Sequence, residues 1–320
     1  MKIKQRKLWD LSRDGLTQGF IGDWLDCRMQ AHLKFREGLG LRGLTPALSF
    51  GLMVHGILER VFHGGFVAQH ILHYSEEVIE EIRKESPNLS PAEEEDLEVA
   101  AGMAEIVTSA YFHFYDFSKR NWIGLEKEFK IPISFHDGLE VPIRGKIDGI
   151  YALNDKLWLF ETKTKGRIHD PVYLDLLTFE LQVMLYGWAV WKLYGKRPVG
   201  VSYNLIQRPQ LRRGKRETIP QFLQRVKEDV TDRLGFYFIQ REVVWTDEDW
   251  AHFQGDFTQT LLEIRGWADR AIRSTRNSRT CVQAWGTCSY LPICSREDCG
   301  GFTRRSVPFP ELGGVENGDH

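Results

Sequence analysis

Residues 141–165 place two carboxylates and a lysine where they could hold a metal ion. The stretch has the pattern of two apolar strands, Pro142 to Ala152 and Leu157 to Lys163, joined by a tight turn at Asn154 and Asp155. A two-residue loop fixes the register of a hairpin, because every facing pair then has the same index sum. The sequence therefore predicts which side chains of the hairpin lie opposite each other.

This register places Asp148 opposite Glu161 and Lys163 opposite Lys146, all on one face. Facing carboxylates repel each other, and nothing in the apolar pattern accounts for them. Mg²⁺ or Mn²⁺ would remove the repulsion, since such ions are commonly held by one or two carboxylates. Lys163 could then orient or deprotonate a bound water, or stabilise charge on a phosphate. The alternative is an exposed hairpin face with ordinary charges.

A helix that precedes the hairpin could supply another ligand. Ala47 to Phe62 has the pattern of an amphipathic helix, in which Gly51, His55 and Glu59 share one face. A neutral imidazole nitrogen of His55 would be a third metal ligand, and Gly51 would allow a close approach of backbone or phosphate. Taken without the carboxylates, His55 is more typical of an ordinary packed or surface histidine.

A second helix follows the hairpin. Residues 173–194 predict one long helix on which Gln182 and Tyr186 share a face one turn apart. An amide can contact a phosphate or a base edge, and a tyrosine can stack on a base or donate to a phosphate. Both side chains could equally be polar groups at the rim of a buried helix.

The segment between the first helix and the hairpin carries no strong chemical signal. Residues 66–118 have a helical pattern and predict an insertion that covers one side of the site. Trp122 to Ile133 predicts the first strand of the sheet. Glu126 and Glu128 on this strand could be accessory site residues, although a solvated edge fits them better.

These motifs resemble those of the PD-(D/E)XK nuclease superfamily, and in particular its RecB-like branch. The motifs, in chain order, are Gly51 to His55, Asp148, Glu161-Thr162-Lys163, and Gln182 to Tyr186. The resemblance spans Trp24 to Cys294. It implies an α/β, restriction-endonuclease-like core with a mixed central sheet flanked by helices, in a single domain over residues 1–300.

The resemblance also implies an activity, namely metal-dependent hydrolysis of DNA phosphodiester bonds at DNA ends or in single strands. An exonuclease of this kind would act in recombination, repair or phage DNA metabolism. Lys163 would position the attacking water, and Gln182 and Tyr186 would contact the nucleic-acid strand. The ligands implied for Mg²⁺ or Mn²⁺ are His55, Asp148, Glu161 and the backbone carbonyl of Thr162.

A basic loop follows the predicted strand Val199 to Ile206. It holds five cations in nine residues, namely Arg208, Arg212, Arg213, Lys215 and Arg216. Such a loop predicts a phosphate-binding patch, in which we count Arg208, Arg212 and Arg213 as candidate substrate contacts. The alternative is a loop that is merely soluble.

The five cysteines indicate a second metal centre. The last four, Cys281, Cys288, Cys294 and Cys299, lack the C-x₂-C pairs typical of structural zinc. In the iron–sulfur members of the RecB-like branch, one cysteine near the start joins three near the end. Cys27 with Cys281, Cys288 and Cys294 resembles that arrangement, which implies a four-iron four-sulfur cluster joining the two ends of the domain. Because Cys299 is additional, a local zinc site from Cys281 to Cys299 stays open.

Composition is that of an ordinary soluble protein, with 320 residues, 42% of them hydrophobic and 27% charged. The formal net charge of −2 favours no class of partner. We expect a cytoplasmic protein without membrane contact, because the chain has no signal-peptide pattern and no apolar run long enough to cross a bilayer. Residues 301–320 are rich in Gly and Pro and predict a disordered tail.

Two other functions are compatible with the sequence. A catalytically silent iron–sulfur scaffold could bind DNA ends for a partner, although the complete set of His55, Asp148, Glu161 and Lys163 argues against it. A zinc-binding adaptor is a third possibility. No G-x-x-x-x-G-K-[ST] motif is present, so the chain has no visible motor of its own. A helicase or recombination partner and self-association are both compatible with this pattern.

Overall fold

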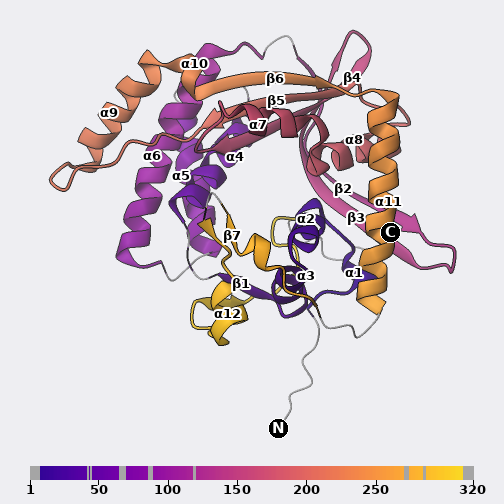
Figure 1. The fold of residues 1–320 in the computed structure, drawn as a ribbon. Coiled ribbons are helices and arrows are strands. Elements are labelled where there is room, and N and C mark those ends of the chain that lie inside the picture. The colour runs from indigo at the N-terminus through magenta and orange to yellow at the C-terminus, as the bar shows by residue number, and fades with distance from the viewer. Residues whose placement is uncertain are drawn as a thin grey trace.

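The computed structural model describes residues 8–41, 43, 45–64, 70–85, 89–117, 120–269, 274–283 and 286–312. A five-stranded sheet lies at the centre, with helices packed against both of its faces (Figure 1). This arrangement confirms the predicted α/β class with a mixed central sheet. Within the described ranges, no helix combines the length and the apolar character needed to cross a membrane.

The central sheet has the strand order β2-β3-β4-β5-β6. Its strands are β2 (Asn121–Ser134), β3 (Glu140–Leu153), β4 (Lys156–Lys165), β5 (Gly200–Gln207) and β6 (Phe238–Val244). β4 and β5 are parallel and the other neighbours are antiparallel. Strand β5 is buried along its whole length, as expected for an apolar strand covered by helices on both faces.

The hairpin of β3 and β4 has the predicted turn and register. Asn154 and Asp155 have φ values of 50° and 59°, as in a type I′ turn, and Leu153 pairs with Lys156. Ladder pairing continues only as far as Gly149 and Phe160. Before that point the free edge of β3 bonds to another segment, because Leu16 donates to Pro142 O and accepts from Arg144 N, both at 2.8 Å.

The predicted pairing of Lys163 with Lys146 is therefore wrong. The two strands have separated before they reach these residues, and Lys146 instead lies opposite Glu128 on β2. Asp148 and Glu161 lie just beyond the last ladder pair, at the fork between the two strands. The fork, and not a continuous ladder, is what opens room for a site.

One group of helices shares a hydrophobic core with the ends of β5 and β6. It consists of α4 (Pro46–Gly64), α5 (His70–Glu85), α6 (Pro91–Phe114), α9 (Ile219–Asp232) and α10 (Leu234–Tyr237). Helix α6 begins with a capping box in which Ser90 and Glu93 bond to each other's backbone. In the predicted helical insertion, the structure thus has α5 and α6, while residues 65–69, 86–88 and 118–119 lie outside the described ranges.

The opposite face of the sheet packs against a second group of helices. These are α1 (Leu11–Asp14), α2 (Gln18–Asp26), α8 (Leu181–Tyr194) and α11 (Asp247–Asp269). The single helix predicted over residues 173–194 is wrong. The structure has α7 (Pro171–Leu176) and the 3-10 turn η2 (Leu177–Phe179), and Glu180 interrupts the helix with φ −60° and ψ 127°.

The first and last segments lie side by side at the bottom of Figure 1. Their elements are α3 (Arg28–Ala31), the π-helix η1 (His32–Arg36), β1 (Leu39–Leu41), η3 (Ser278–Thr280), β7 (Val282–Gln283), β8 (Gly286–Thr287), α12 (Leu291–Arg296) and β9 (Phe302–Arg304). β1 and β9 pair antiparallel. The prediction of disorder is wrong for residues 302–312, because Phe302, Phe309 and Leu312 are buried and anchor this segment despite its Gly and Pro content. Residues 313–320 lie outside the described ranges.

Candidate active site

The fork between β3 and β4 brings the predicted carboxylates together. Thr162 donates its backbone N–H to Asp148 Oδ2 at 2.8 Å, which ties the two strands together at the fork. Glu161 is 3% exposed and Thr162 is equally buried. The side chain of Asp148 is 16% exposed, so the fork is open to solvent on the Asp148 side.

Without a bound metal ion, the ionised forms of Asp148 and Glu161 are electrostatically unfavourable. Burial raises the pKa of Asp148, and the nearby charge of Glu126 raises it further. Burial and the charge of Asp148 likewise raise the pKa of Glu161. A buried pair of like charges in this position is typical of a site that binds a cation.

Lys163 lies beside Glu161 and is held by several acceptors. Its Nζ atom is 3.1 Å from Glu161 Oε1 and 3.1 Å from Glu180 Oε1. Burial alone would lower the pKa of Lys163, but the two carboxylates raise it well above its usual range. The lysine is therefore a fixed ammonium donor in this structure.

Gln182 on α8 links the lysine to the carboxylate. Its Oε1 accepts a hydrogen bond from Lys163 Nζ at 2.5 Å, and its Nε2 donates to Glu161 Oε1 at 2.8 Å. The two bonds fix the orientation of the amide. Tyr186, one turn later, is buried against Phe129, and a Cβ atom at Gly145 would come within 2.9 Å of the Tyr186 ring. Glycine at position 145 thus makes room for the tyrosine.

Helix α4 brings His55 to the other side of Asp148. His55 Nδ1 lies 3.9 Å from Asp148 Oδ2. Desolvation lowers the pKa of His55, which favours the neutral ring that can ligate a metal. A Cβ atom at Gly51 would lie 3.2 Å from Thr164 Oγ1, so the glycine lets α4 approach β4 closely.

Two acidic residues of the site have no clear signal in the sequence. The sequence does not reveal Glu180, because the predicted helix continues through this residue. In the structure the helix is interrupted at Glu180, and its carboxylate forms an ion pair with Lys163. Glu126 was expected at a solvated edge, and this is wrong, because its side chain is 14% exposed and lies 2.6 Å from Lys146 Nζ. Its neighbour Glu128 is exposed, as expected. The register of β2 with β3, which the turn at Asn154 and Asp155 does not set, places Glu126 across from Asp148.

The basic loop begins at the same end of the sheet as Lys163. Arg208 donates its backbone N–H to Lys165 O at 2.7 Å. Farther along, Arg212 is exposed, while Arg213 forms an ion pair with Glu95 on α6. The loop that precedes α9 thus extends past α6, at the left of Figure 1. Of the three predicted substrate contacts, Arg208 has its backbone nearest the end of β4 that carries Lys163 and Lys165.

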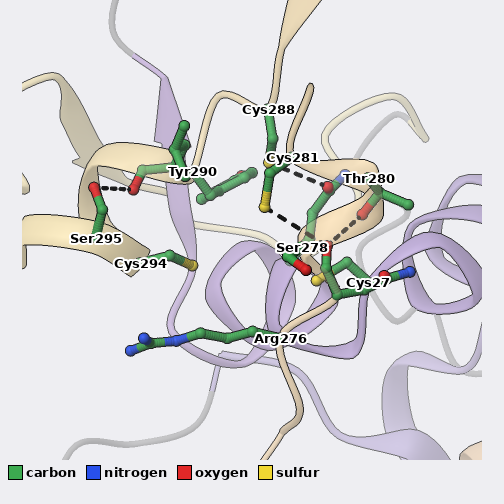
Figure 2. Close-up of a pocket in the computed structure, with 12 residues that line it drawn as sticks. Cys27, Arg276, Ser278, Thr280, Cys281, Cys288, Tyr290, Cys294 and Ser295 are labelled. Carbon is green, nitrogen blue, oxygen red and sulfur yellow. Dashed lines mark hydrogen bonds between the residues drawn. The ribbon is translucent and has the colours of Figure 1, made fainter. Parts of the chain in front are cut away.

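Four cysteines from the two ends of the described chain line one cavity of 190 Å³ (Figure 2). They are Cys27, Cys281, Cys288 and Cys294. All are free thiols, and the fifth, Cys299, is exposed and is not among the residues that line the cavity. The structure therefore brings together the four predicted cluster ligands.

In the part of the chain that the structure describes, no three His, Cys, Asp or Glu side chains lie close enough to hold a single metal ion. This holds for the carboxylates at the fork as well as for the cysteines. At the fork, the nearest cation to Glu161 is the Lys163 ammonium. The donor types at the fork nevertheless suit Mg²⁺ or Mn²⁺, because they are two carboxylates, a carbonyl and an imidazole.

Comparison with known proteins gives one family and one fold. A family model described as the PD-(D/E)XK nuclease superfamily matches residues 21–295. The crystal structure of a "Putative exonuclease" from Eubacterium rectale is similar, with a TM-score of 0.52 and 10% sequence identity, and the match covers 98% of this chain and 100% of that one. At this identity the likeness shows a shared fold alone. No curated protein matches the sequence.

Proposed function

The chain belongs to the PD-(D/E)XK nuclease superfamily, and from this premise we propose that it is a metal-dependent deoxyribonuclease of the RecB-like branch. It cleaves DNA at ends or in single strands, in recombination, repair or phage DNA metabolism. The observation that carries the proposal is the pair of carboxylates at the fork, Asp148, which is partly buried, and Glu161, which is buried, with Lys163 beside Glu161. His55 on α4 and Gln182 on α8 flank this group, in the order of the RecB-like motifs.

The residues at the fork fit a divalent ion. Asp148, Glu161, the carbonyl of Thr162 and a neutral His55 would hold Mg²⁺ or Mn²⁺, and binding would remove the repulsion that raises the pKa of both carboxylates. Such an ion polarises the phosphate and supplies an activated water.

The protein's own side chains position the reacting groups and donate hydrogen bonds to them. Lys163 directs an ammonium group to the phosphate or to the attacking water, and the Gln182 amide holds this ammonium beside Glu161. Arg208 and Arg212 contribute positive charge for the flanking phosphates of the strand, and the ion pair of Arg213 with Glu95 holds their loop against α6.

We propose a four-iron four-sulfur cluster for the cysteine cavity. Cys27, Cys281, Cys288 and Cys294 line a common cavity, and a cluster that binds each thiolate through a different iron atom would use all four. The local zinc alternative also requires Cys299, which does not line the cavity.

Cleavage of matched substrates tests the proposed function. Anaerobically purified protein with Mg²⁺ is expected to degrade linear single-stranded or duplex DNA labelled at one end, and to spare RNA of the same sequence. The position of the label in the first products gives the polarity. Cleavage of RNA alone, or cleavage that persists in a chelator, would contradict the proposal.

Asp148→Asn is expected to stabilise the metal-free protein while removing its response to Mg²⁺. The change removes a charge that burial and Glu126 disfavour, and an asparagine oxygen can still accept from Thr162 N–H. We expect a gain of about 1 kcal/mol, or a few degrees in melting temperature, in a chelator. Mg²⁺ should raise the melting temperature of wild type and leave that of Asp148→Asn unchanged. An equal response of both proteins would place the metal elsewhere.

Gln182→Leu is expected to lower kcat by about ten- to a hundredfold with little change in stability. Leucine keeps the volume but neither donates to Glu161 nor accepts from Lys163, so the ammonium loses one of its three acceptors. Single-turnover cleavage of labelled DNA measures the effect. Gln182→Glu keeps an acceptor for Lys163 but places a carboxylate oxygen against Glu161 in place of the donor, so it should also be less active than wild type.

A further inference from the structure

Lys146 is a second lysine at the fork, and it contacts a different set of carboxylates from Lys163. Its Nζ atom lies 2.6 Å from Glu126 Oε2 and 3.9 Å from Glu59 Oε2. Glu59 is one helical turn beyond His55 on α4. The ammonium therefore joins strand β2 to helix α4 beside the proposed metal ligands.

Glu126 is placed to share a cation with Asp148. In the β2–β3 ladder, the pair Leu125–Gly149 precedes these two residues and the pair Lys127–Ile147 follows them, so Glu126 lies across from Asp148. Asp148 on β3 thus lies between Glu126 on one side and the strand that carries Glu161 on the other.

The backbone at Glu126 is strained. Its φ of 46° is in the left-handed region, which costs a residue other than glycine of order 1 kcal/mol or more. Burial raises the pKa of Glu126 even though Lys146 lowers it. A partly buried carboxylate held by strained backbone next to a proposed metal ligand calls for a functional explanation, and neither the fold nor the family motifs above account for it.

We propose that the Lys146 ammonium takes the place of a second divalent ion, so that this site binds one metal ion and not two. The inference rests on the proposed function. In two-metal nucleases the ions lie roughly 3.5 to 4 Å apart and neutralise the oxygens on both sides of the phosphate. Here Glu126, Glu59 and Asp148 would be the acidic groups around the second position. The ammonium of Lys146 already forms ion pairs with two of them, Glu126 and Glu59.

The proposed second metal position is accessible to solvent, so a metal ion could enter it if Lys146 were replaced. The side chains of Lys146 and Glu59 are 36% and 37% exposed, so a hydrated ion can reach the carboxylates once the ammonium is removed. Lys146→Met removes the charge and keeps the apolar stem of the side chain. It leaves Glu126 buried beside Asp148 without a cation.

Counting bound Mn²⁺ tests the proposal, with the free ion measured by electron paramagnetic resonance on the full-length, anaerobically purified protein. We expect about one Mn²⁺ per chain for wild type and about two for Lys146→Met. Lys146→Arg keeps the charge and should bind one. The double variant Lys146→Met with Glu126→Gln lacks the carboxylate that lies across from Asp148, and should also bind one.

Three outcomes would overturn the inference. Two ions in wild type would show that the ammonium does not fill the second position. A single ion in Lys146→Met, in protein that melts cooperatively, would show that no second position exists. No Mn²⁺ in wild type would remove the proposed metal site and this inference with it. The first two outcomes leave the nuclease proposal standing, so its failure is distinguishable from that of the inference.

Discussion

Lys163→Ala is expected to abolish cleavage of labelled DNA in Mg²⁺, with a loss of about 10²- to 10³-fold or more. The lysine donates to Gln182 and lies 3.1 Å from Glu161 and from Glu180, so its ammonium is an ordered donor beside the proposed metal ligand Glu161. Its removal also leaves the carboxylates of Glu161 and Glu180 with less positive charge beside them. We therefore expect a modest fall in melting temperature alongside the loss of activity.

Lys156→Ala is the matched control for this variant. Lys156 lies on the same strand, β4, but is exposed at the hairpin turn opposite Leu153. Its replacement should leave the cleavage rate within about twofold of wild type, since exposed substitutions of this kind have small effects. Full activity of a folded Lys163→Ala protein would remove the lysine from the mechanism.

Cys27→Ala is expected to remove the iron–sulfur cluster and to destabilise the fold. Cys27 is buried and comes from the start of the chain, whereas the other three cysteines of the cavity come from its end. Because the free energy of binding a metal group is also folding free energy, we expect the melting temperature to fall by on the order of 10 °C. Iron content, from roughly four atoms per chain to almost none, and the loss of absorbance near 400 nm measure the effect.

Cys299→Ala separates this cluster from a local zinc site. Cys299 is exposed, and its sulfur lies 3.9 Å from the carbonyl oxygen of Glu297. The cluster account predicts unchanged iron content and melting temperature for this variant. Zinc in place of iron, lost in Cys299→Ala and kept in Cys27→Ala, would contradict the cluster.

The sequence predicted the hairpin and its carboxylates because the determinants are local. Asn154 and Asp155 form the two-residue turn, and the turn alone sets the register of Leu153 with Lys156. His55 and Gln182 were also found locally, from helical spacing and motif order. The same reasoning failed a few residues beyond, where Leu16 bonds to β3 and ends its pairing with β4.

Two site residues that the sequence did not assign, Glu180 and Glu126, depend on contacts between segments that are far apart in the chain. Glu180 acts on Lys163 only because α8 begins there after a break, and the apolar pattern continues through the break. Glu126 lies at the site because it pairs with Lys146 and because its backbone is left-handed, a conformation that secondary-structure propensities do not predict. The last segment was misjudged because Phe309 and Leu312 pack into the main core, an effect that composition does not reveal.

Removing and restoring the metal in one reaction tests the central claim most directly. Wild-type protein is given DNA labelled at one end in a chelator, then excess Mg²⁺, and the products are followed with time. The account predicts no cleavage before the addition and progressive loss of labelled DNA after it, with Asp148→Asn inactive throughout. Cleavage in the chelator, or equal cleavage by Asp148→Asn after the addition, would contradict a metal site at Asp148 and Glu161.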